Sequence, residues 1–275
     1  MLEIPEAIVI ASELNQTIKD KRIEKVIAAA SPHKFAWFFG DHSQYHSLLR
    51  GRKIENAAPY GGRVEINAGG IFLHFCDGVN LRYYAAGENV PPKHQLFLAF
   101  EDGSALVGTV AMYGGLWCFA EGAFDGNDYY KASKEAVSPL SDRFDYTLFL
   151  TLFDQKGMKM SAKGFLATGQ RIPGLGNGVL QDILLNAGIH PKKKMNTLSD
   201  AQKRKLFDSI KATLAEMVEG GGRNTERDLF GNWGGYETKL SKNTVLSLCS
   251  SCGGAIKKET YMGGSIYYCE HCQER

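Results

Sequence analysis

The sequence predicts an α+β fold made of three parts that follow one another along the chain. The first half alternates short apolar runs with turn residues, the second half carries apolar residues at helical spacing, and the end of the chain holds two CxxC pairs. We expect an N-terminal helix and β-sandwich domain over residues 1–136, a helical domain over 137–245 and a small cysteine module over 246–275.

The first half begins with one amphipathic helix. Residues 5–19 place Ile8, Ala11, Leu14 and Ile18 on one face, which is the spacing of a helix with one buried side. The short runs that follow are rich in β-branched and aromatic residues and are separated by Gly, Asp and Pro, a pattern typical of a sandwich or barrel. The expected strands cover residues 23–30, 34–39, 63–66, 70–75, 95–100, 104–110 and 116–119.

The pattern becomes helical after Ser138-Pro139. The stretch Ser199-Asp-Ala-Gln202 is a capping box that predicts the start of a long helix, and Gly220-Gly-Gly222 predicts its end. The glycine- and asparagine-rich segment over residues 220–235 is expected to be a flexible loop. The expected helices cover residues 146–156, 161–168, 178–186, 199–219 and 224–229.

Four cysteines near the C-terminus have the spacing of a metal site. Cys249 and Cys252 form one CxxC pair, and Cys269 and Cys272 form the second pair after sixteen further residues. Each CxxC turn can present two thiolates to one point, so four of them favour a closed, structural Zn²⁺ site that does no chemistry. The residues between the pairs, with Met262-Gly-Gly264 at their centre, predict a β-hairpin. Two disulfides or four free thiols are the alternatives.

Composition excludes several classes of protein. Hydrophobic residues make up 44% and charged residues 23% of the chain, which is ordinary for a soluble globular protein. No apolar run approaches the roughly 18 residues that span a bilayer. The N-terminus carries Glu3 and Glu6 in place of the basic residues of a signal peptide, and Cys76 and Cys118 are left as free thiols. We therefore expect a cytoplasmic protein.

The net charge of +2 conceals a basic segment. Residues 156–215 hold eleven Lys and Arg against three Asp and Glu, a balance of +8, so the rest of the chain carries −6. The densest clusters are Lys192-Lys-Lys194 and Lys203-Arg-Lys205. A basic segment in a nearly neutral chain indicates a surface for polyanions, although a solvated helical face would give the same count.

The most specific internal motif is Gln170-Arg-Ile-Pro-Gly-Leu-Gly-Asn177, which joins two expected helices. Gly174 and Gly176 permit a tight turn and close approach to a partner. The helix that begins near Asn177 would direct free N–H groups outward, as in a phosphate site. Asn177 could instead serve only as a helix N-cap. Lys163, in the preceding helix, is either a further phosphate ligand or a solvated lysine.

This motif, followed by Ala187-Gly-Ile-His-Pro191 and by the closing Cys-x-x-Cys-Gln273, resembles the formamidopyrimidine-DNA glycosylase / endonuclease VIII (Fpg/Nei) family. The resemblance implies a helix-two-turn-helix domain, a zinc-finger hairpin, and a monomeric two-domain clamp on double-stranded DNA. It implies a damaged or abasic nucleotide flipped out of the duplex. Asn177, Gly174 and Gly176 would hold phosphates, the hairpin would press on the same backbone, and the loop over 220–235 would read the base. The protein would be associated with the nucleoid when bound to DNA.

The resemblance also implies DNA glycosylase and AP lyase chemistry in base excision repair. The family nucleophile is the amine of a proline exposed by removal of the initiator Met; it attacks the sugar and forms a Schiff base while a nearby Glu handles protons. This chain keeps Glu3 and Glu6 but has Leu2 at the place of the proline. The amine of Met1 is the remaining candidate, one residue or about 3.8 Å further out. Glu3 could activate water for base removal, or only complement a helix dipole.

Other positions depart from the family pattern. Arg63 lies next to the place of a family lysine, Asp77 replaces an intercalating Met, and Gly264 replaces an arginine at the hairpin tip. Met112 and Tyr113 occupy a loop that carries arginines in the family, and we expect them to contact DNA by wedging between bases.

Three functions are compatible with these residues. The chain is a DNA glycosylase or AP lyase with an atypical nucleophile, a catalytically silent lesion-binding or regulatory DNA-binding protein, or a protein-interaction module that keeps only the fold. Salt dependence separates the third function from the others, because phosphate contacts weaken steeply as salt rises.

Overall fold

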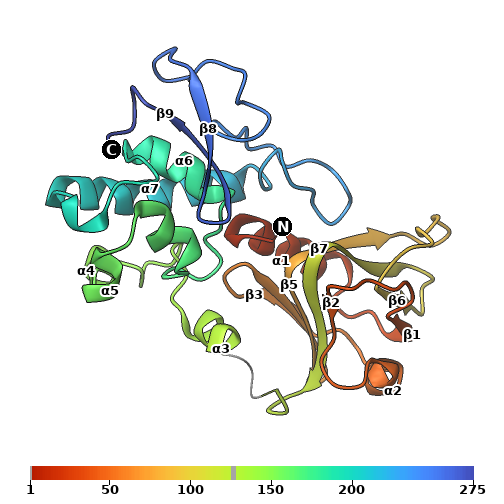
Figure 1. The fold of residues 1–275 in the computed structure, drawn as a ribbon. Helices are drawn as coiled ribbons and strands as arrows, with labels where there is room; N and C mark the ends of the chain where they lie inside the picture. Colours follow the sequence, from red (N-terminus) through yellow and green to blue (C-terminus); the bar gives the residue numbers. More distant parts are fainter. Residues whose placement is uncertain (1, 125–127) are drawn as a thin grey trace.

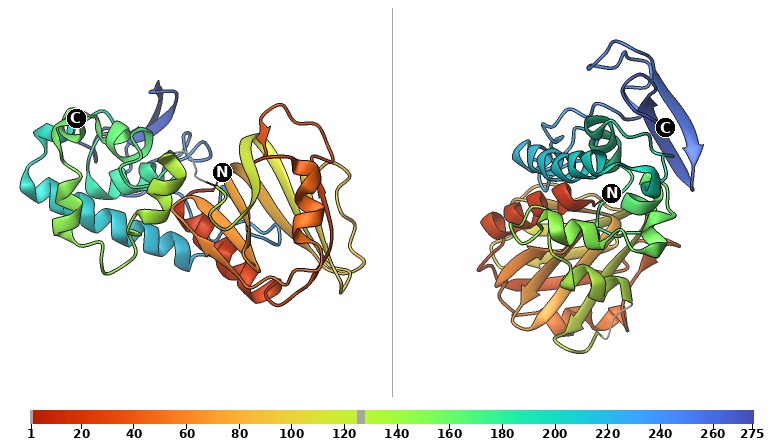
Figure 2. Two further views of the ribbon diagram at one scale, coloured as in Figure 1. Left: turned by 90° about the horizontal axis from the view of Figure 1, so that it is seen from below. Right: turned by 90° about the vertical axis from the view of Figure 1, so that its left-hand side faces the viewer.

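The computed structural model describes residues 2–124 and 128–275 and confirms the α+β class. A sheet lobe and a helical lobe lie side by side, and a C-terminal hairpin stands on the helical lobe (Figure 1). Helix α1 (Ile4–Thr17) lies between the two lobes and contacts β3 and β4 on one side and α7 on the other (Figure 2).

The seven strands of the first lobe join in one hydrogen-bonded sheet with the order β1-β6-β7-β5-β4-β3, and β2 pairs in parallel with β7. Two strands are much longer than expected, because the segments predicted as separate strands at 104–110 and 116–119 form one continuous β7 that pairs with a continuous β5. The strands are β1 (Ile23–Ala28), β2 (Ala36–Trp37), β3 (Asn56–Pro59), β4 (Arg63–Ala68), β5 (Ile71–Tyr84), β6 (Leu96–Phe100) and β7 (Ala105–Ala120). The short helix α2 (Tyr45–Leu49), preceded by a 3-10 turn (His42–Gln44), joins β2 to β3.

A bulge divides the two long strands into halves. Asp77 pairs with Gly114 and Val79 pairs with Val110, so one residue of β5 faces three residues of β7 at this point. Such bulges bend a sheet and raise its twist. The halves on either side of the bulge share one apolar core, to which β1 and β6 contribute from one wing and β4 from the other. The predicted sandwich is therefore built from one bent sheet.

Helix α1 belongs to both lobes. Ala7, Ile10 and Leu14 are buried in the core of the sheet lobe, whereas Ile4 is buried in the core of the helical lobe. An amphipathic helix usually covers one core. Here the first turn projects into the second core, so the start of the chain lies where the lobes meet.

The helical lobe is built around α6 and α7, which pack against each other. Ser199 and Gln202 form the predicted capping box at the start of α7, and Gly188 ends α6 in the left-handed conformation that favours glycine. None of the helices in the described residues is long and apolar enough to cross a bilayer. The elements are α3 (Asp128–Glu135), α4 (Tyr146–Thr151), α5 (Gln155–Met158), a π-helical turn (Gly164–Thr168), α6 (Val179–Ala187), a 3-10 turn (Met195–Thr197) and α7 (Asp200–Glu219).

The prediction of a helix over residues 224–229 is wrong. This segment forms turns held by single bridges, Arg223 with Tyr236 and Arg227 with Trp233. The Asp228 side chain accepts the backbone N–H groups of Phe230 and Asn232, a local bond that competes with helix formation. Leu229 inserts into the core of the sheet lobe, so the segment straps the two lobes together.

The C-terminal hairpin consists of β8 (Ile256–Tyr261) and β9 (Gly264–Cys269). Tyr261 pairs with Gly264, which leaves Met262 and Gly263 as a two-residue turn, both with positive φ. This is the geometry that suits a tight β-hairpin. A small third core joins the base of the hairpin to Leu185 of α6.

The lobes meet at a contact between glycines. Gly174 has a φ of +81°, and a Cβ there would lie 1.9 Å from the backbone nitrogen of Gly62. A Cβ on Gly61 would likewise lie 2.6 Å from the carbonyl oxygen of Pro173. The turn between β3 and β4 therefore packs backbone to backbone against the turn before α6.

We predict that Gly174→Ala lowers the free energy of unfolding by about 3 kcal/mol, because it adds a clash to an unfavourable φ. Gly70→Ala is the matched control, since Gly70 has a φ of +78° and open space around it; it should cost only about 1 kcal/mol. Chemical denaturation of both variants measures the difference. Equal losses would show that the glycine contact does not hold the lobes together.

Candidate DNA-binding site and N-terminal pocket

The Glu3 side chain joins the N-terminus of the chain to the helical lobe. One carboxylate oxygen accepts the backbone N–H of Gly178 at 2.9 Å, and the other accepts that of Val179 at 2.8 Å. Glu3 makes no capping bond to its own helix α1. It instead occupies the positive end of α6, where unpaired N–H groups favour an anion. The helix whose dipole Glu3 complements is thus α6, which is far away in the sequence, and not its own helix α1.

Arg223 completes this junction. Its guanidinium is 2% exposed, donates two bonds of 2.8 Å to Glu6, and lies 3.5 Å from Glu3. Burial raises the pKa of Glu3, while Arg223 and the two backbone N–H groups oppose that rise. Burial also opposes the charge of Arg223, but the two carboxylates hold the pKa of Arg223 above its usual value. Both predicted catalytic acids are therefore tied to one buried cation.

A small polar pocket of about 60 Å³ opens beside the start of the chain. The backbone N–H of Leu2 donates to the carbonyl of Asp77 at 2.9 Å, which fixes the chain at the pocket wall. Arg63 and Tyr129 line the same pocket. Met1, the predicted alternative nucleophile, lies outside the described residues. The first described residue is thus held within reach of an arginine.

A row of polar side chains that contact one another packs against Arg63 on the side away from the pocket. Arg63 Nη1 lies 3.1 Å from His74 Nε2, and His74 Nδ1 lies 3.3 Å from a carboxylate oxygen of Glu65. Lys134 donates to Glu65 at 2.6 Å. Burial lowers the pKa of His74. Burial also acts to raise the pKa of Glu65, but hydrogen bonds from His74 and Lys134 outweigh this effect and lower that pKa. Arg63 is 5% exposed, makes no ion pair with an acid in the described part of the chain, and lines the pocket.

The residues predicted to hold phosphates at α6 have partners within the protein. Gly174 and Gly176 lie against the Gly61–Gly62 turn and the Glu3 carboxylate respectively. The Asn177 side chain donates to the carbonyl of Ser265 in the hairpin at 2.9 Å, and it is not an N-cap for α6. Its Oδ1 is buried without a partner in the described structure. Close packing between segments accounts for these glycines, and Asn177 links α6 to the hairpin.

Lys163 is not a solvated lysine, and its contact with a phosphate stays a prediction. Its side chain is 2% exposed and donates to the carbonyls of Tyr261 at 2.5 Å and Gly264 at 3.3 Å. Burial lowers the pKa of Lys163. Since Gly264 has no side chain, the ammonium group lies directly against the hairpin tip. Lys163 and Asn177 together clamp the hairpin onto the helical lobe.

The four C-terminal cysteines converge on one point. Their sulfur atoms all lie within 4.8 Å of one another, with Cys249 and Cys272 at 3.9 Å and Cys252 and Cys269 at 3.4 Å. A tetrahedron with Zn–S bonds of about 2.3 Å has edges of about 3.8 Å. None of the four forms a disulfide, so the disulfide alternative is not realised. The cluster can hold a metal ion.

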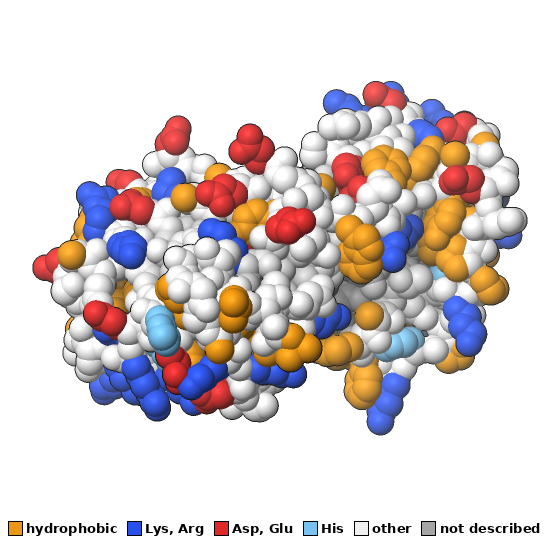
Figure 3. Space-filling model, turned by 90° about the horizontal axis from the view of Figure 1, so that it is seen from above, with side chains coloured by type: hydrophobic (Ala, Val, Ile, Leu, Met, Phe, Trp, Pro, Cys, Tyr) orange, Lys and Arg blue, Asp and Glu red, His pale blue; other side chains and the backbone are white. Residues whose placement is uncertain are grey.

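Met112 and Tyr113 lie in the bulge of β7 and are 64% and 36% exposed. They are therefore exposed to solvent, and their contact with DNA stays a prediction. Figure 3 shows hydrophobic side chains on both lobes beside the hollow that separates them. Gly78 of β5 lets the two backbones approach closely at the bulge, because a Cβ there would meet the carbonyl oxygen of Tyr113 at 2.6 Å.

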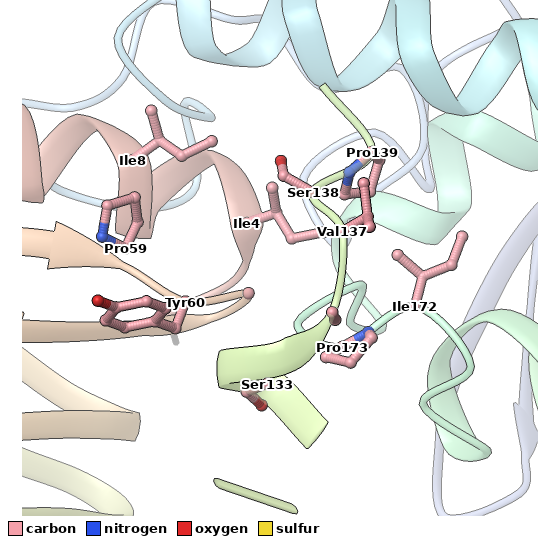
Figure 4. Close-up of a pocket in the computed structure, with 12 residues that line it drawn as sticks. Ile4, Ile8, Pro59, Tyr60, Ser133, Val137, Ser138, Pro139, Ile172 and Pro173 are labelled. Carbon is pink, nitrogen blue, oxygen red and sulfur yellow. The ribbon is translucent and has the colours of Figure 1, made fainter. Parts of the chain in front are cut away.

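A second hollow of about 120 Å³ lies at the junction between α1, the β3–β4 turn and the turn before α6 (Figure 4). Its lining is mainly apolar and includes Ile4, Ile172 and Pro173, with no charged side chain. The polar contacts of the junction therefore lie around Glu3, away from this hollow.

Sequence reasoning missed several residues of the site. Arg223 follows three glycines in a segment interpreted as a loop, and only its charge opposite two buried acids points to its role. Tyr129 and Lys134 belong to α3, which was not predicted. Gln170 was noted only as the first residue of the turn motif, yet its side chain accepts the backbone N–H of Gly174 at 3.0 Å.

Comparisons with known proteins agree with this architecture. The model of the formamidopyrimidine-DNA glycosylase H2TH domain matches residues 136–228. The chain is 28% identical to a formamidopyrimidine-DNA glycosylase of Shouchella clausii over the full length of both, and 27% identical to one of Hydrogenovibrio crunogenus over all of this chain and 97% of that protein. A crystal structure of Lactococcus lactis Fpg in complex with abasic-site DNA has a similar fold, with a TM-score of 0.83, 22% identity, and coverage of 99% of this chain and 100% of that one.

A bent N-terminal sheet, a helix-two-turn-helix lobe and a four-cysteine hairpin define the two-domain class of DNA glycosylase folds. Within that class, residues 136–228 match the formamidopyrimidine-DNA glycosylase H2TH domain, and the whole chain is similar to formamidopyrimidine-DNA glycosylases, in agreement with the Fpg/Nei resemblance of its sequence motifs.

We predict that Glu3→Gln lowers the free energy of unfolding by about 3 kcal/mol, because it removes one partner of a buried charge cluster. Glu24→Gln, which changes an exposed acid of β1, is the control and should cost less than about 0.5 kcal/mol. Thermal or urea unfolding measures both. If the two variants unfold alike, Glu3 does not carry the junction.

Proposed function

We propose that this chain is a base-excision-repair protein of the DNA glycosylase type, which binds duplex DNA at a damaged or abasic nucleotide. The observation that carries the proposal is the N-terminal pocket, where the start of the chain and the unpaired charge of Arg63 face the same space. A flipped sugar brings a carbon centre and its flanking phosphates together, which suits an amine and a cation held side by side. The proposed activity places the protein with the chromosome, in the cytoplasm.

Relatives support the partner in this proposal. The similar proteins carry the name formamidopyrimidine-DNA glycosylase, and the similar crystal structures include Lactococcus lactis Fpg bound to abasic DNA and to Fapy-dG DNA. The basic segment over 156–215 supplies the charge that a polyanion requires. Binding to the pocket is easiest where the duplex is already damaged, because unstacking then costs least.

The chemistry in this proposal starts from the N-terminal amine of Met1. The nitrogen of Leu2 is an amide whose N–H is bonded to Asp77, so it is not a nucleophile while Met1 is attached. Glu3 and Glu6 are buried and bonded to Arg223, and their role is to position the N-terminus and the lobes. The amine of Met1 would attack the aldehyde carbon of the ring-opened sugar at an abasic site, and loss of water would then give a Schiff base.

A catalytically silent lesion binder is the second candidate. Leu2 favours it, because a displacement of even about 1 Å from the productive geometry can cost on the order of a hundredfold in rate. Both candidates require the same DNA contacts, so they differ only in whether a covalent adduct forms.

We further propose that Zn²⁺ binds the sulfur atoms of Cys249, Cys252, Cys269 and Cys272. The backbone N–H of Gly254 already donates to the sulfur of Cys252 at 3.4 Å, an interaction that suits a thiolate ligand. Four protein ligands leave no open position, so the metal would hold the hairpin in shape and take no part in a reaction.

The DNA-binding proposal is tested by affinity for a duplex with one abasic site and for the intact duplex, measured from 50 to 200 mM salt. We expect tighter binding to the abasic duplex and a fall of at least about tenfold across this range. Arg63→Met should make the slope of log affinity against log salt shallower by about 0.9, while Arg63→Lys should retain it. Equal affinity for both duplexes, without salt dependence, would contradict the proposal.

Removal of zinc should weaken DNA binding roughly tenfold, because the hairpin then loses its fixed position above Lys163 and Asn177. Metal analysis, affinity and far-UV circular dichroism are measured before and after chelation. Cys252→Ser should reproduce the loss of metal, whereas Cys118→Ala in the sheet lobe should retain it. The metal assignment is wrong if complete zinc removal leaves both the spectrum and the affinity unchanged.

A further inference from the structure

Helix α3 brings one side chain to the N-terminal pocket from outside the sheet. The helix lies between the sheet and the rest of the helical lobe (Figure 1). Tyr129, its second residue, lines the pocket beside Leu2, Arg63 and Asp77. Tyr129 is 40% exposed, so a ligand that enters the pocket can reach it.

The next residues of α3 fasten the helix to the sheet. The hydroxyl group of Tyr130 donates to one carboxylate oxygen of Glu65 in β4 at 3.0 Å, and Lys134 donates to the other at 2.6 Å. The ammonium group of Lys134 also lies 3.9 Å from the ring centroid of Tyr60. Because Glu65 is 3% exposed, these charge-assisted bonds are shielded from water. Tyr129 is therefore presented to the pocket by an anchored helix.

The ring of Tyr129 covers one side of Arg63. The guanidinium carbon of Arg63 lies 5.0 Å from the centroid of the Tyr129 ring, which is within the range of a cation–π interaction. His74 contacts the same guanidinium group at 3.1 Å. A guanidinium carries five N–H donors, so Arg63 keeps donors for a ligand while the ring and the imidazole hold it in place.

The hydroxyl group of Tyr129 is a second donor at the pocket. It has no hydrogen-bond partner within residues 2–124 and 128–275. Burial raises the pKa of Tyr129 to about 12, and Arg63 opposes that rise only in part. The hydroxyl group therefore stays protonated at neutral pH and can donate. An ionised carboxylate such as that of Asp77 only accepts, so Arg63 and Tyr129 are the neighbouring side chains that suit an anionic oxygen.

We propose that Tyr129 and Arg63 together bind a phosphate that flanks the flipped abasic sugar, with the hydroxyl group of Tyr129 donating to one phosphate oxygen. This inference rests on the proposed function. A phosphate offers several acceptor oxygens and no donor, so it matches two donors that lie side by side. Flipping draws the flanking phosphates toward the pocket, and the contact therefore forms at the lesion and not along an intact duplex.

The test measures affinity for a duplex with one abasic site and for the intact duplex, under conditions in which circular dichroism shows each variant to be folded. Tyr129→Phe removes only the hydroxyl group and should weaken binding to the abasic duplex at least about fivefold, with less than about a twofold change for the intact duplex. Tyr129→Leu also removes the ring from Arg63 and should weaken abasic binding at least about tenfold. Tyr84→Phe, which changes a half-buried tyrosine at the end of β5, is the control and should change neither affinity.

Two further abasic duplexes identify the bound group. One carries a neutral methylphosphonate in place of the phosphate on the 5′ side of the abasic site, and the other carries it on the 3′ side. On one of these two duplexes Tyr129→Phe should lose most of its effect, because the charge that the hydroxyl group meets has been removed.

The outcomes separate this inference from the proposed function. If the unaltered protein binds the abasic and intact duplexes equally, the proposed function fails. If it prefers the abasic duplex but Tyr129→Phe binds that duplex as tightly, or weakens both duplexes equally, the role of Tyr129 is overturned. An effect that persists on both methylphosphonate duplexes also overturns it. A loss confined to the abasic duplex and to one flanking phosphate supports it.

Discussion

The buried carboxylate of Glu3 is the contact on which the arrangement of the two lobes depends. It caps α6, which belongs to the helical lobe, although it is only the third residue of a chain whose next helix enters the core of the sheet lobe. Desolvation of this charge is offset by two backbone N–H groups and by Arg223, which also binds Glu6. The glycine contact between Gly174 and Gly62 lies alongside it. These contacts fix the start of the chain at the pocket and leave little freedom for the lobes to drift apart.

The same junction holds the fold together through residues other than those at which the chain departs from the Fpg/Nei pattern. Residues that hold the frame are present and paired, including Glu3, Glu6 and Asn177. The residues that differ, Leu2 and Arg63, face the pocket or border it. Lys163 is used to secure the hairpin tip, where Gly264 has no side chain of its own to offer. The proposed DNA binding and the proposed amine chemistry therefore depend on different residues.

Sequence patterns predicted those parts of the molecule whose cause is local. The capping box at Ser199 and the hairpin between the CxxC pairs follow from neighbouring residues, and both are present. Long-range packing decided the rest. Nothing near Arg223 in the sequence indicates that it meets Glu6, and the charge of Lys163 gives no sign that hairpin carbonyls surround it. The predicted strands are shorter than β5 and β7, because the pattern around residues 76–79 and 111–115 gives no sign that a bulge lets both strands continue.

The most direct test of the central claim is borohydride trapping on a labelled duplex with one abasic site, with noncovalent binding read on the same gel and any adduct mapped by peptide analysis. We expect the abasic duplex to be retained, and any covalent adduct to map to the N-terminal amine, because Leu2 lines the pocket that is proposed to hold the sugar. Absence of retention, or an adduct on a lysine remote from Leu2 and Arg63, would contradict the assignment of this pocket.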